Sequence, residues 1–239
     1  MDGDPLGAAM LDYQRGGLRG ECRYVDGPET ADGHIQANYF RDMRDMDEAW
    51  EQALLALGEP VLDVGCGSGQ YALWLQGHGR DVVPFDVSPG AVEAARDRGV
   101  EDAHVADMFD MPYPESAFPG LLANGTQLGL GGSIPGIRDL LCEFARVTTS
   151  DATAWVDEYD PAKLDDTGEM FGYRPDPREG VAHRTFHFEY DRDGERLVGE
   201  TLHFLLVAPD RLRDACVGTP WSVTDVDEGE VYYKAKLEK

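Results

Sequence analysis

The chain has 239 residues, which is enough for one α/β domain with an elaboration and a proper hydrophobic core. It carries 46 Asp and Glu against 21 Lys and Arg, so its formal net charge is -25 at pH 7. Because the acidic residues are spread along the chain and no basic stripe exists to release phosphate counterions, we expect no nucleic-acid and no membrane partner.

The basic residues are unusual in kind as well as in number. All are arginine except four lysines (Lys163, Lys234, Lys236 and Lys239). An acidic surface with little lysine resembles the proteins of salt-accumulating halophiles, at whose ionic strength a Debye length of about 3 Å screens the self-repulsion. High salt also weakens charge-driven binding for every protein, so in a halophile the acidity would exclude nucleic acid less firmly.

Cysteine and histidine spacing predicts neither a metal site nor a disulfide framework. The cysteines lie far apart without a C-x-x-C pair, which fits a reduced cytoplasm (Cys22, Cys66, Cys142 and Cys216). His183 and His203 lack metal-ligand spacing with any acid or cysteine. No signal-peptide pattern and no apolar run of about 20 residues is present, so we expect a soluble, cytoplasmic protein.

The first quarter of the chain reads as an arm followed by a helix. Residues 1–34 are rich in glycine and acid with apolar side chains between, which is typical of either a partly disordered tail or an arm that folds over a site. From residue 35 to 57 the pattern becomes helical, because apolar residues such as Trp50 recur on one helical face. A glycine and a proline then end the helix, which places the first strand of a sheet at residues 61–64.

That strand runs directly into a glycine-rich turn, with the sequence Val-Leu-Asp-Val-Gly-Cys-Gly-Ser-Gly at residues 61–69. Three alternate glycines remove Cβ atoms where the backbone turns sharply and approaches a ligand (Gly65, Gly67 and Gly69). A dinucleotide fingerprint requires a glycine at the position of Gln70, so NAD is disfavoured. The turn therefore predicts a nucleotide-like cofactor other than NAD.

Strand and helix patterns alternate after the turn. We expect strands at residues 82–85, 102–106, 121–123 and 152–156, and helices from Gln70, from Ser88 and over residues 137–147. Alternation of this kind predicts a doubly wound, mostly parallel sheet with helices on both faces.

The last third of the chain has a different pattern. Residues 184–190 and 197–207 predict an antiparallel hairpin, and alternation places Phe186, Phe188 and Tyr190 on one face of it. A helix over 209–216 and strands at 221–226 and 231–237 complete the expected sheet.

The glycine turn and two acidic strand ends resemble those of class I S-adenosylmethionine (SAM)-dependent methyltransferases. Their first motif, hydrophobic-hydrophobic-(Asp/Glu)-hydrophobic-G-x-G-x-G, is matched by residues 61–69. Asp86 ends the next strand, 21 positions after Gly65, where a carboxylate accepts hydrogen bonds from both ribose hydroxyls. Asp107 follows the third strand, and the resemblance assigns it to the adenine amino group. The family implies an α/β, Rossmann-like, doubly wound seven-stranded sheet, mostly parallel with an antiparallel last strand, here with the hairpin as an elaboration.

The resemblance also implies the remaining cofactor-binding positions. Beside Asp86 and Asp107 they are Asp63, Gly65, Cys66, Gly67, Gly69, Val87 and Met108. Related enzymes place an arginine of the leading helix on the SAM carboxylate. Arg41 and Arg44 both suit that place, and the sequence does not choose between them.

The acceptor side is expected after the fourth and fifth strands. Residues 124–127 lack the [DN]-P-P-[YF] of methyltransferases that act on nucleic acids or glutamine, and resemble the Gly-Asn-Ser of glycine N-methyltransferase-like enzymes. Asn124 either orients SAM or the acceptor, or ties down its own loop. Tyr159 is the first acceptor-side candidate, ahead of Tyr39 and His183, and positioning dominates the chemistry because the methyl donor is already activated.

Four segments and one leading function follow from these observations. The expected segments are an arm (1–34), a SAM-binding core (35–160), an antiparallel insertion that walls the acceptor site (161–207) and a C-terminal helix with strands (208–239). The expected function is a SAM-dependent methyltransferase for a small intracellular molecule. The rivals are a SAM-binding sensor or scaffold without turnover, and a methyltransferase that acts on RNA or protein.

Overall fold

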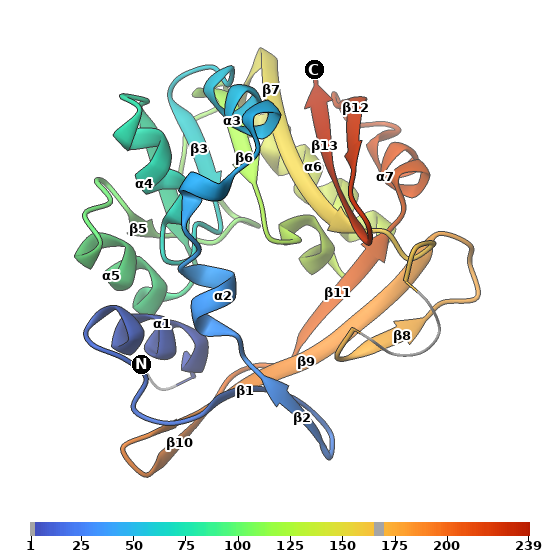
Figure 1. The fold of residues 1–239 in the computed structure, drawn as a ribbon. Helices are drawn as coiled ribbons and strands as arrows, with labels where there is room; N and C mark the ends of the chain where they lie inside the picture. Colours follow the sequence, from blue (N-terminus) through green and yellow to red (C-terminus); the bar gives the residue numbers. More distant parts are fainter. Residues whose placement is uncertain (1–2, 165–169) are drawn as a thin grey trace. The chain divides into compact units, whose positions relative to one another are not determined.

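A computed structural model describes residues 3–164 and 170–239 (Figure 1). The chain divides into two compact units. Unit 1 comprises Met1–Asp107 with Phe186–Thr201, and unit 2 comprises Met108–Thr185 with Leu202–Lys239. The strand β9 (Val181–Arg192) contributes to both. The division into four segments stays a prediction.

Unit 1 begins with three elements inside the expected arm: α1 (Pro5–Gln14), β1 (Cys22–Asp26) and β2 (Glu29–Asp32). They are followed by α2 (Ile35–Tyr39), the 3-10 helix η1 (Met43–Asp45), α3 (Glu48–Leu55), β3 (Val61–Val64), α4 (Gln70–Gly77), β4 (Val82–Asp86), α5 (Pro89–Asp97), β5 (His104–Val105) and, after β9, β10 (Glu195–Val198). The expected strands and helices between residues 61 and 105 are therefore present.

The parallel part of unit 1 consists of two mostly apolar strands, β3 and β4, and the short β5. Every residue of β3 is buried, as parallel strands covered on both faces require. β4 pairs in parallel with β3 and with β5, in the register Val61↔Val82 and Phe85↔His104. The helix α5 begins as expected, because the Ser88 hydroxyl accepts a hydrogen bond from the Ala91 N–H at 3.0 Å and Pro89 is the first helical residue. All carboxyl ends of these strands meet at one edge.

The single helix expected over residues 35–57 is wrong. The structure breaks it into α2, η1 and α3, because two aspartates start new elements. The Asp42 carboxylate accepts a hydrogen bond from the Arg44 N–H at 3.0 Å, and the Asp47 carboxylate accepts one from the Trp50 N–H at 2.8 Å. Arg41 and Arg44 consequently do not share a helix.

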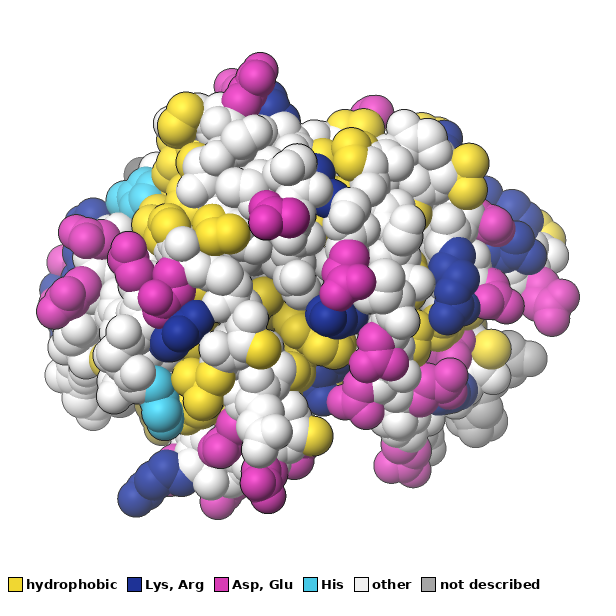
Figure 2. Space-filling model, turned by 90° about the horizontal axis from the view of Figure 1, so that it is seen from above, with side chains coloured by type: hydrophobic (Ala, Val, Ile, Leu, Met, Phe, Trp, Pro, Cys, Tyr) yellow, Lys and Arg dark blue, Asp and Glu magenta, His cyan; other side chains and the backbone are white. Residues whose placement is uncertain are grey.

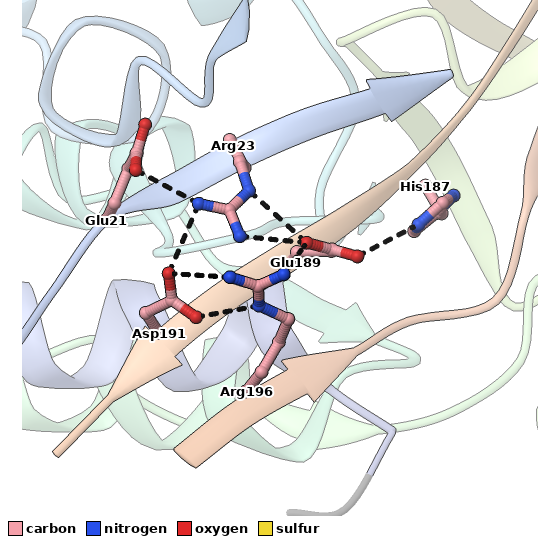
Figure 3. Close-up of polar contacts among 6 residues, drawn as sticks. All are labelled: Glu21, Arg23, His187, Glu189, Asp191 and Arg196. Carbon is pink, nitrogen blue, oxygen red and sulfur yellow. Dashed lines mark hydrogen bonds and ion pairs between the residues drawn. The ribbon is translucent and has the colours of Figure 1, made fainter. Parts of the chain in front are cut away.

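An antiparallel sheet carries the arm of unit 1. β1 pairs with β2 and with β9, and β10 pairs with β9. Phe186, Phe188 and Tyr190 are buried, so the predicted alternation in β9 is confirmed. Figure 3 shows the other face, where Arg23 and Arg196 interleave with carboxylates of β9 and its neighbourhood. Ion pairs thus join β1 to the β9–β10 hairpin, which is distant from β1 in the sequence.

Unit 2 contains β6 (Phe118–Ala123), the 3-10 helix η2 (Gln127–Gly131), α6 (Ile134–Val147), β7 (Thr148–Tyr159), β8 (Tyr173–Pro175), β11 (Leu202–Val207), α7 (Pro209–Cys216), β12 (Ser222–Glu228) and β13 (Tyr232–Glu238). β7 pairs in parallel with β6 and antiparallel with β13, which pairs antiparallel with β12. Buried hydrogen bonds fasten the unit: Trp221 Nε1 donates to the Leu141 carbonyl and the Tyr233 hydroxyl to the Val207 carbonyl, at 2.9 and 2.8 Å.

The second hairpin strand expected over 197–207 is interrupted. Its residues form β10 and β11, separated at Gly199–Thr201. Gly199 donates its N–H to the Phe188 carbonyl at 2.9 Å, and a Cβ on Gly199 would lie 3.0 Å from Pro5 Cγ. The strand is interrupted where Gly199 closely approaches the arm.

The predicted fold class is confirmed. The chain has an α/β, Rossmann-like fold with a seven-stranded, mostly parallel sheet whose last strand, β13, is antiparallel, together with a separate antiparallel sheet. Among residues 3–164 and 170–239, no helix has the length and apolarity that a membrane crossing requires.

Candidate functional site

The glycine turn follows β3 at its carboxyl end. Gly65, Gly67 and Gly69 have φ values of 67°, 55° and 74°, in the left-handed region that glycine adopts without strain. A Cβ on Gly69 would lie 2.6 Å from a methyl carbon of Val100, so this glycine also permits close helix packing. The Cys66 N–H donates to the Phe85 carbonyl at 2.9 Å, which fixes the turn beside the end of β4.

The carboxylate of Asp86 holds the turn from the next strand. Its Oδ2 accepts a hydrogen bond from the Gly67 N–H and its Oδ1 accepts one from the Ser88 N–H, each at 2.8 Å. Burial raises the pKa of Asp86, and the hydrogen bonds from Ser88 and Gly67 oppose that rise. Each carboxylate oxygen has a second lone pair, so the group can also accept from the two hydroxyls of a ribose.

Asp63 is a buried acid without a full set of partners. Its side chain lies in β3 at 3% exposure, and its Oδ2 has no hydrogen-bond partner among the described residues. Burial, then the nearby charge of Asp86, raises the pKa of Asp63 to about 7. An orphaned carboxyl oxygen beside a glycine turn fits a ligand that brings a hydrogen-bond donor or a positive charge.

The adenine side of the expected cofactor has suitable groups in unit 1. Val87 follows Asp86 and is 68% exposed, an apolar surface on which a flat ring can pack. The Ala106 N–H donates to the Asp86 carbonyl at 3.1 Å, so the exposed Asp107 follows at the same edge as Asp86. Turn, acids and exposed valine together fit an adenosine-containing cofactor.

Two residues contact the glycine turn although the sequence did not place them there. Tyr39, a candidate for the acceptor side, lies against the turn: a Cβ on Gly67 would be 3.6 Å from its ring, and its carbonyl accepts a hydrogen bond from the Ser68 hydroxyl. Arg98 donates to the Ser68 carbonyl at 3.0 Å and lies over the Phe40 ring at 5.0 Å. No spacing rule connects residues 39 and 98 with 67, so the sequence carries no signal for this cluster.

The structure places the two candidate arginines differently. Arg44 is an exposed side chain whose guanidinium donates to both oxygens of Asp42, to Oδ1 at 2.9 Å and to Oδ2 at 2.5 Å. Arg41 lies between α2 and η1, is exposed, and forms no ion pair within the described part of the chain. The assignment of either to a SAM carboxylate stays a prediction, and the Asp42 contact favours Arg41.

In unit 2, the carboxylate of Asp157 holds the loop that contains the candidate Asn124. The Asp157 Oδ1 accepts hydrogen bonds from the Gly125 and Thr126 N–H groups at 2.8 and 2.7 Å. With its amide oriented to suit its neighbours, Asn124 donates to Asp157 Oδ2 at 3.1 Å. The loop-tying alternative thus has a specific partner, which sequence reasoning missed.

The other unit 2 candidates lie in different surroundings. Met108 is buried, and Tyr159 is half-buried at the end of β7 with its ring centroid 6.4 Å from that of Tyr232. His183, which has no metal-ligand spacing with an acid or cysteine in the sequence, has its Nε2 2.9 Å from Asp176 Oδ2 and its Nδ1 3.0 Å from His203 Nε2. Within the described residues, no group of three or more His, Cys, Asp and Glu side chains could hold a metal ion.

Comparisons with known proteins show which families and folds the chain is similar to. Residues 62–156 match the model of a methyltransferase domain. Methyltransferase GfsG of Streptomyces halstedii is 33% identical over 109 residues, which are 42% of this chain and 38% of that protein. The ribosomal protein L11 methyltransferase of Cupriavidus taiwanensis is 44% identical over 64 residues, 26% of this chain and 21% of that protein. The chain thus spans well under half the length of these curated relatives.

One solved structure is similar along almost the whole chain. It is a SAM-dependent methyltransferase from Bacteroides fragilis in complex with S-adenosyl-L-homocysteine, with a TM-score of 0.78 and 23% identity over 98% of this chain and 94% of that one. At this identity the likeness concerns the fold. The chain therefore has the Rossmann-like fold of SAM-dependent methyltransferases, and its residues 62–156 are similar to the methyltransferase domain family.

Proposed function

We propose that the protein is a SAM-dependent methyltransferase. The observation that carries the proposal is the position of Asp86, whose carboxylate is held across the glycine turn by the Gly67 and Ser88 N–H groups. A carboxylate held there has two oxygens that can accept hydrogen bonds from a ribose diol, beside a turn whose glycines admit a close ligand, and this supports the proposal. The methyltransferase domain similarity over residues 62–156 supports the same assignment.

In this proposal unit 1 binds and orients the cofactor. Asp86 accepts from the ribose hydroxyls, Val87 packs on the adenine and Asp107 accepts from its amino group. Asp63 offers its unpartnered Oδ2 to the positively charged end of the ligand. SAM supplies a methyl group that its sulfonium has already activated, so positioning by the chain provides most of the catalysis.

The proposed acceptor is a small molecule inside the cell, for which Asn124 and Tyr159 are the candidate contacts. The net charge of -25 disfavours a polyanionic acceptor. On the face drawn in Figure 2, acidic side chains are scattered with basic and apolar ones between them. A protein acceptor is the second candidate, because the similar relatives include a methyltransferase named for ribosomal protein L11.

The test is transfer of labelled methyl from SAM into fractionated cell extract. We expect label in the low-molecular-mass filtrate, surviving nuclease and protease treatment, with activity at least about tenfold lower for Asp86→Ala because ribose hydrogen bonds are lost. The matched control is Asp81→Ala, an exposed aspartate just before the same strand, which should retain activity.

Other outcomes separate the rivals. Label in macromolecules that nuclease or protease releases would contradict a small-molecule acceptor. No transfer by a protein that nevertheless binds S-adenosylhomocysteine would favour a sensor or scaffold. Equal activity of the Asp86 and Asp81 variants would overturn the ribose assignment.

A further inference from the structure

The N-terminal helix of unit 1 lies backbone to backbone against the helix that follows Asp86. α1 and α5 run side by side (Figure 1), and two glycines permit their contact. A Cβ on Gly90 would lie 2.4 Å from the Gly7 carbonyl carbon, and a Cβ on Gly7 would lie 2.0 Å from the Ser88 hydroxyl oxygen. A side chain at Gly90 would displace the backbone of α1, whereas one at Gly7 would displace the side chains of Ser88 and Asp4.

One carboxylate caps both of these helices. Asp4 precedes α1, and its Oδ1 accepts a hydrogen bond from the Gly7 N–H at 3.0 Å. Its Oδ2 accepts another from the Gly90 N–H in the first turn of α5, also at 3.0 Å. The Ser88 hydroxyl donates to the same carboxylate, 2.9 and 2.8 Å from its two oxygens. Asp4 therefore supplies a charged acceptor to orphan donors of two helix starts.

Ser88 connects this carboxylate to the proposed ribose acid. Its hydroxyl accepts from the Ala91 N–H at 3.0 Å while donating to Asp4, so its rotamer is fixed from both sides. Its backbone N–H donates to Asp86 Oδ1 at 2.8 Å. A hydrogen-bonded path of two links therefore runs from residue 4 to residue 86. The negative charge of Asp4 also contributes to the raised pKa of Asp86.

We propose that Asp4 is a positioning residue of the cofactor site: through Ser88 it holds the carboxylate of Asp86 in the orientation that receives the ribose diol. The inference rests on the proposed function for the role of Asp86. It makes α1 a part of the site rather than a covering arm, although residue 4 does not touch the cofactor. The physical basis is that Asp86 can accept from both ribose hydroxyls only when its carboxylate plane has the right orientation. The Ser88 and Gly67 N–H groups set that plane.

The test measures the affinity for S-adenosylhomocysteine by calorimetry, independently of turnover. We expect Asp4→Ala to weaken binding about fivefold to tenfold, because Asp86 loses its fixed orientation. The matched control is Arg15→Ala, since Arg15 joins the same two helices through Glu93 and Asp97 at 2.6 and 2.7 Å but lies far along α1 from Ser88. Its affinity should stay within about twofold of the wild type, because exposed ion pairs contribute little.

A double-mutant cycle distinguishes positioning from general loss of stability. If Asp4 acts through Asp86, the Asp4→Ala effect disappears in an Asp86→Ala background. The inference would be overturned if Asp4→Ala lowered the affinity equally in the wild-type and Asp86→Ala backgrounds. It would also be overturned if Asp4→Ala bound with wild-type affinity while Asp86→Ala bound weakly, and in both cases the proposed function would stand. Wild-type affinity in Asp86→Ala would instead remove the proposed function on which it rests.

A conservative variant covers the case in which Asp4→Ala fails to fold. Asp4→Asn keeps one acceptor oxygen for the helix caps but loses the charge and one lone-pair set. We expect a folded protein with an affinity between those of the wild type and Asp4→Ala or, if the latter is unfolded, at least about twofold below the wild type. Wild-type affinity in Asp4→Asn together with unfolded Asp4→Ala would assign Asp4 a purely structural role and contradict the proposal.

Discussion

At the scale of single residues, the site depends on two buried carboxyls in neighbouring parallel strands. Asp63 and Asp86 lie in β3 and β4, and burial is the largest cause of the raised pKa of each. Asp86 is compensated by two backbone N–H donors, whereas Asp63 keeps an oxygen without a partner among the described residues. The less satisfied of the two acids is the one that a cationic ligand would stabilise.

The raised pKa of Asp63 predicts a pH-dependent loss of stability. The pKa is about 7 in the folded state, against about 3.9 for an unperturbed aspartate. Between these values the folded state keeps a proton that the unfolded chain has released, so the free energy of unfolding falls as pH rises. In Asp63→Asn the side chain at this position is uncharged at every pH, so the variant avoids this loss of stability. Relative to the wild type, we expect it to gain about 2 kcal/mol between pH 5 and pH 8, allowing for relaxation around the charge.

Urea unfolding of the wild type and of Asp63→Asn at several pH values between these limits measures this gain. Asp81→Asn serves as the control, because Asp81 is exposed and should give a pH-independent difference. Parallel stability curves for the wild type and Asp63→Asn would show that Asp63 is ionised in the folded protein without cost.

The sequence could indicate only those site residues that lie within a local sequence pattern. Asp63, Asp86 and the glycines lie within a strand–turn–helix pattern, so their neighbourhood follows from spacing alone. Tyr39 and Arg98 reach the same turn through tertiary contacts with Ser68, and no local pattern encodes them. The acceptor-side predictions for Asn124 and Tyr159, like the cofactor roles of the other candidates, stay predictions.

At the scale of elements, the arm of unit 1 is secured by charge. Arg23 in β1 is only 11% exposed in its side chain, and its guanidinium lies 3.0 Å from Glu189, 3.2 Å from Asp191 and 3.0 Å from Glu21. Arg196 of β10 approaches Asp191 at 2.9 Å and Glu189 at 3.5 Å (Figure 3). The enclosed guanidinium compensates carboxylates that would otherwise repel one another.

Removal of that guanidinium should be costly. We expect Arg23→Ala to lower the free energy of unfolding by about 2 kcal/mol, because Glu189 is left partly buried without its main counter-ion. Arg196→Ala removes contacts with the same carboxylates from a side chain that is 54% exposed. It should lose less than about 1 kcal/mol. Denaturant titration of both variants measures the difference, and equal losses would contradict a special role for the enclosed arginine.

The predicted boundaries of helices and strands were wrong where local caps or tertiary contacts override the hydrophobic pattern. The apolar spacing over residues 35–57 favoured one helix, but Asp42 and Asp47 cap new starts within it. The hairpin strand was interrupted near Gly199, where a tertiary approach to Pro5 prevails. By contrast, the start of α5 at Ser88 and Pro89 was predicted because cap and first-turn residues act locally.

At the scale of the whole molecule, alternation of strands and helices predicted a doubly wound, mostly parallel sheet, and the resemblance to methyltransferases implied its seven strands and their order of direction. The seven-stranded sheet with its antiparallel last strand was confirmed. The arm was left open by the sequence because its apolar residues have no period; its order comes from tertiary contacts such as those of Arg23 and Asp4. The net charge of -25 is a property of the whole chain. Adaptation to high salt and a cytoplasmic location stay predictions.

The central claim is that the glycine turn binds a SAM-type cofactor, and one calorimetric titration tests it most directly. The wild-type protein, in buffer with about 2 M KCl to screen its self-repulsion, is titrated with S-adenosylhomocysteine and, separately, with NAD. We predict saturable binding of S-adenosylhomocysteine at one site per chain and no saturable heat with NAD. Saturable binding of NAD without binding of S-adenosylhomocysteine would contradict the account.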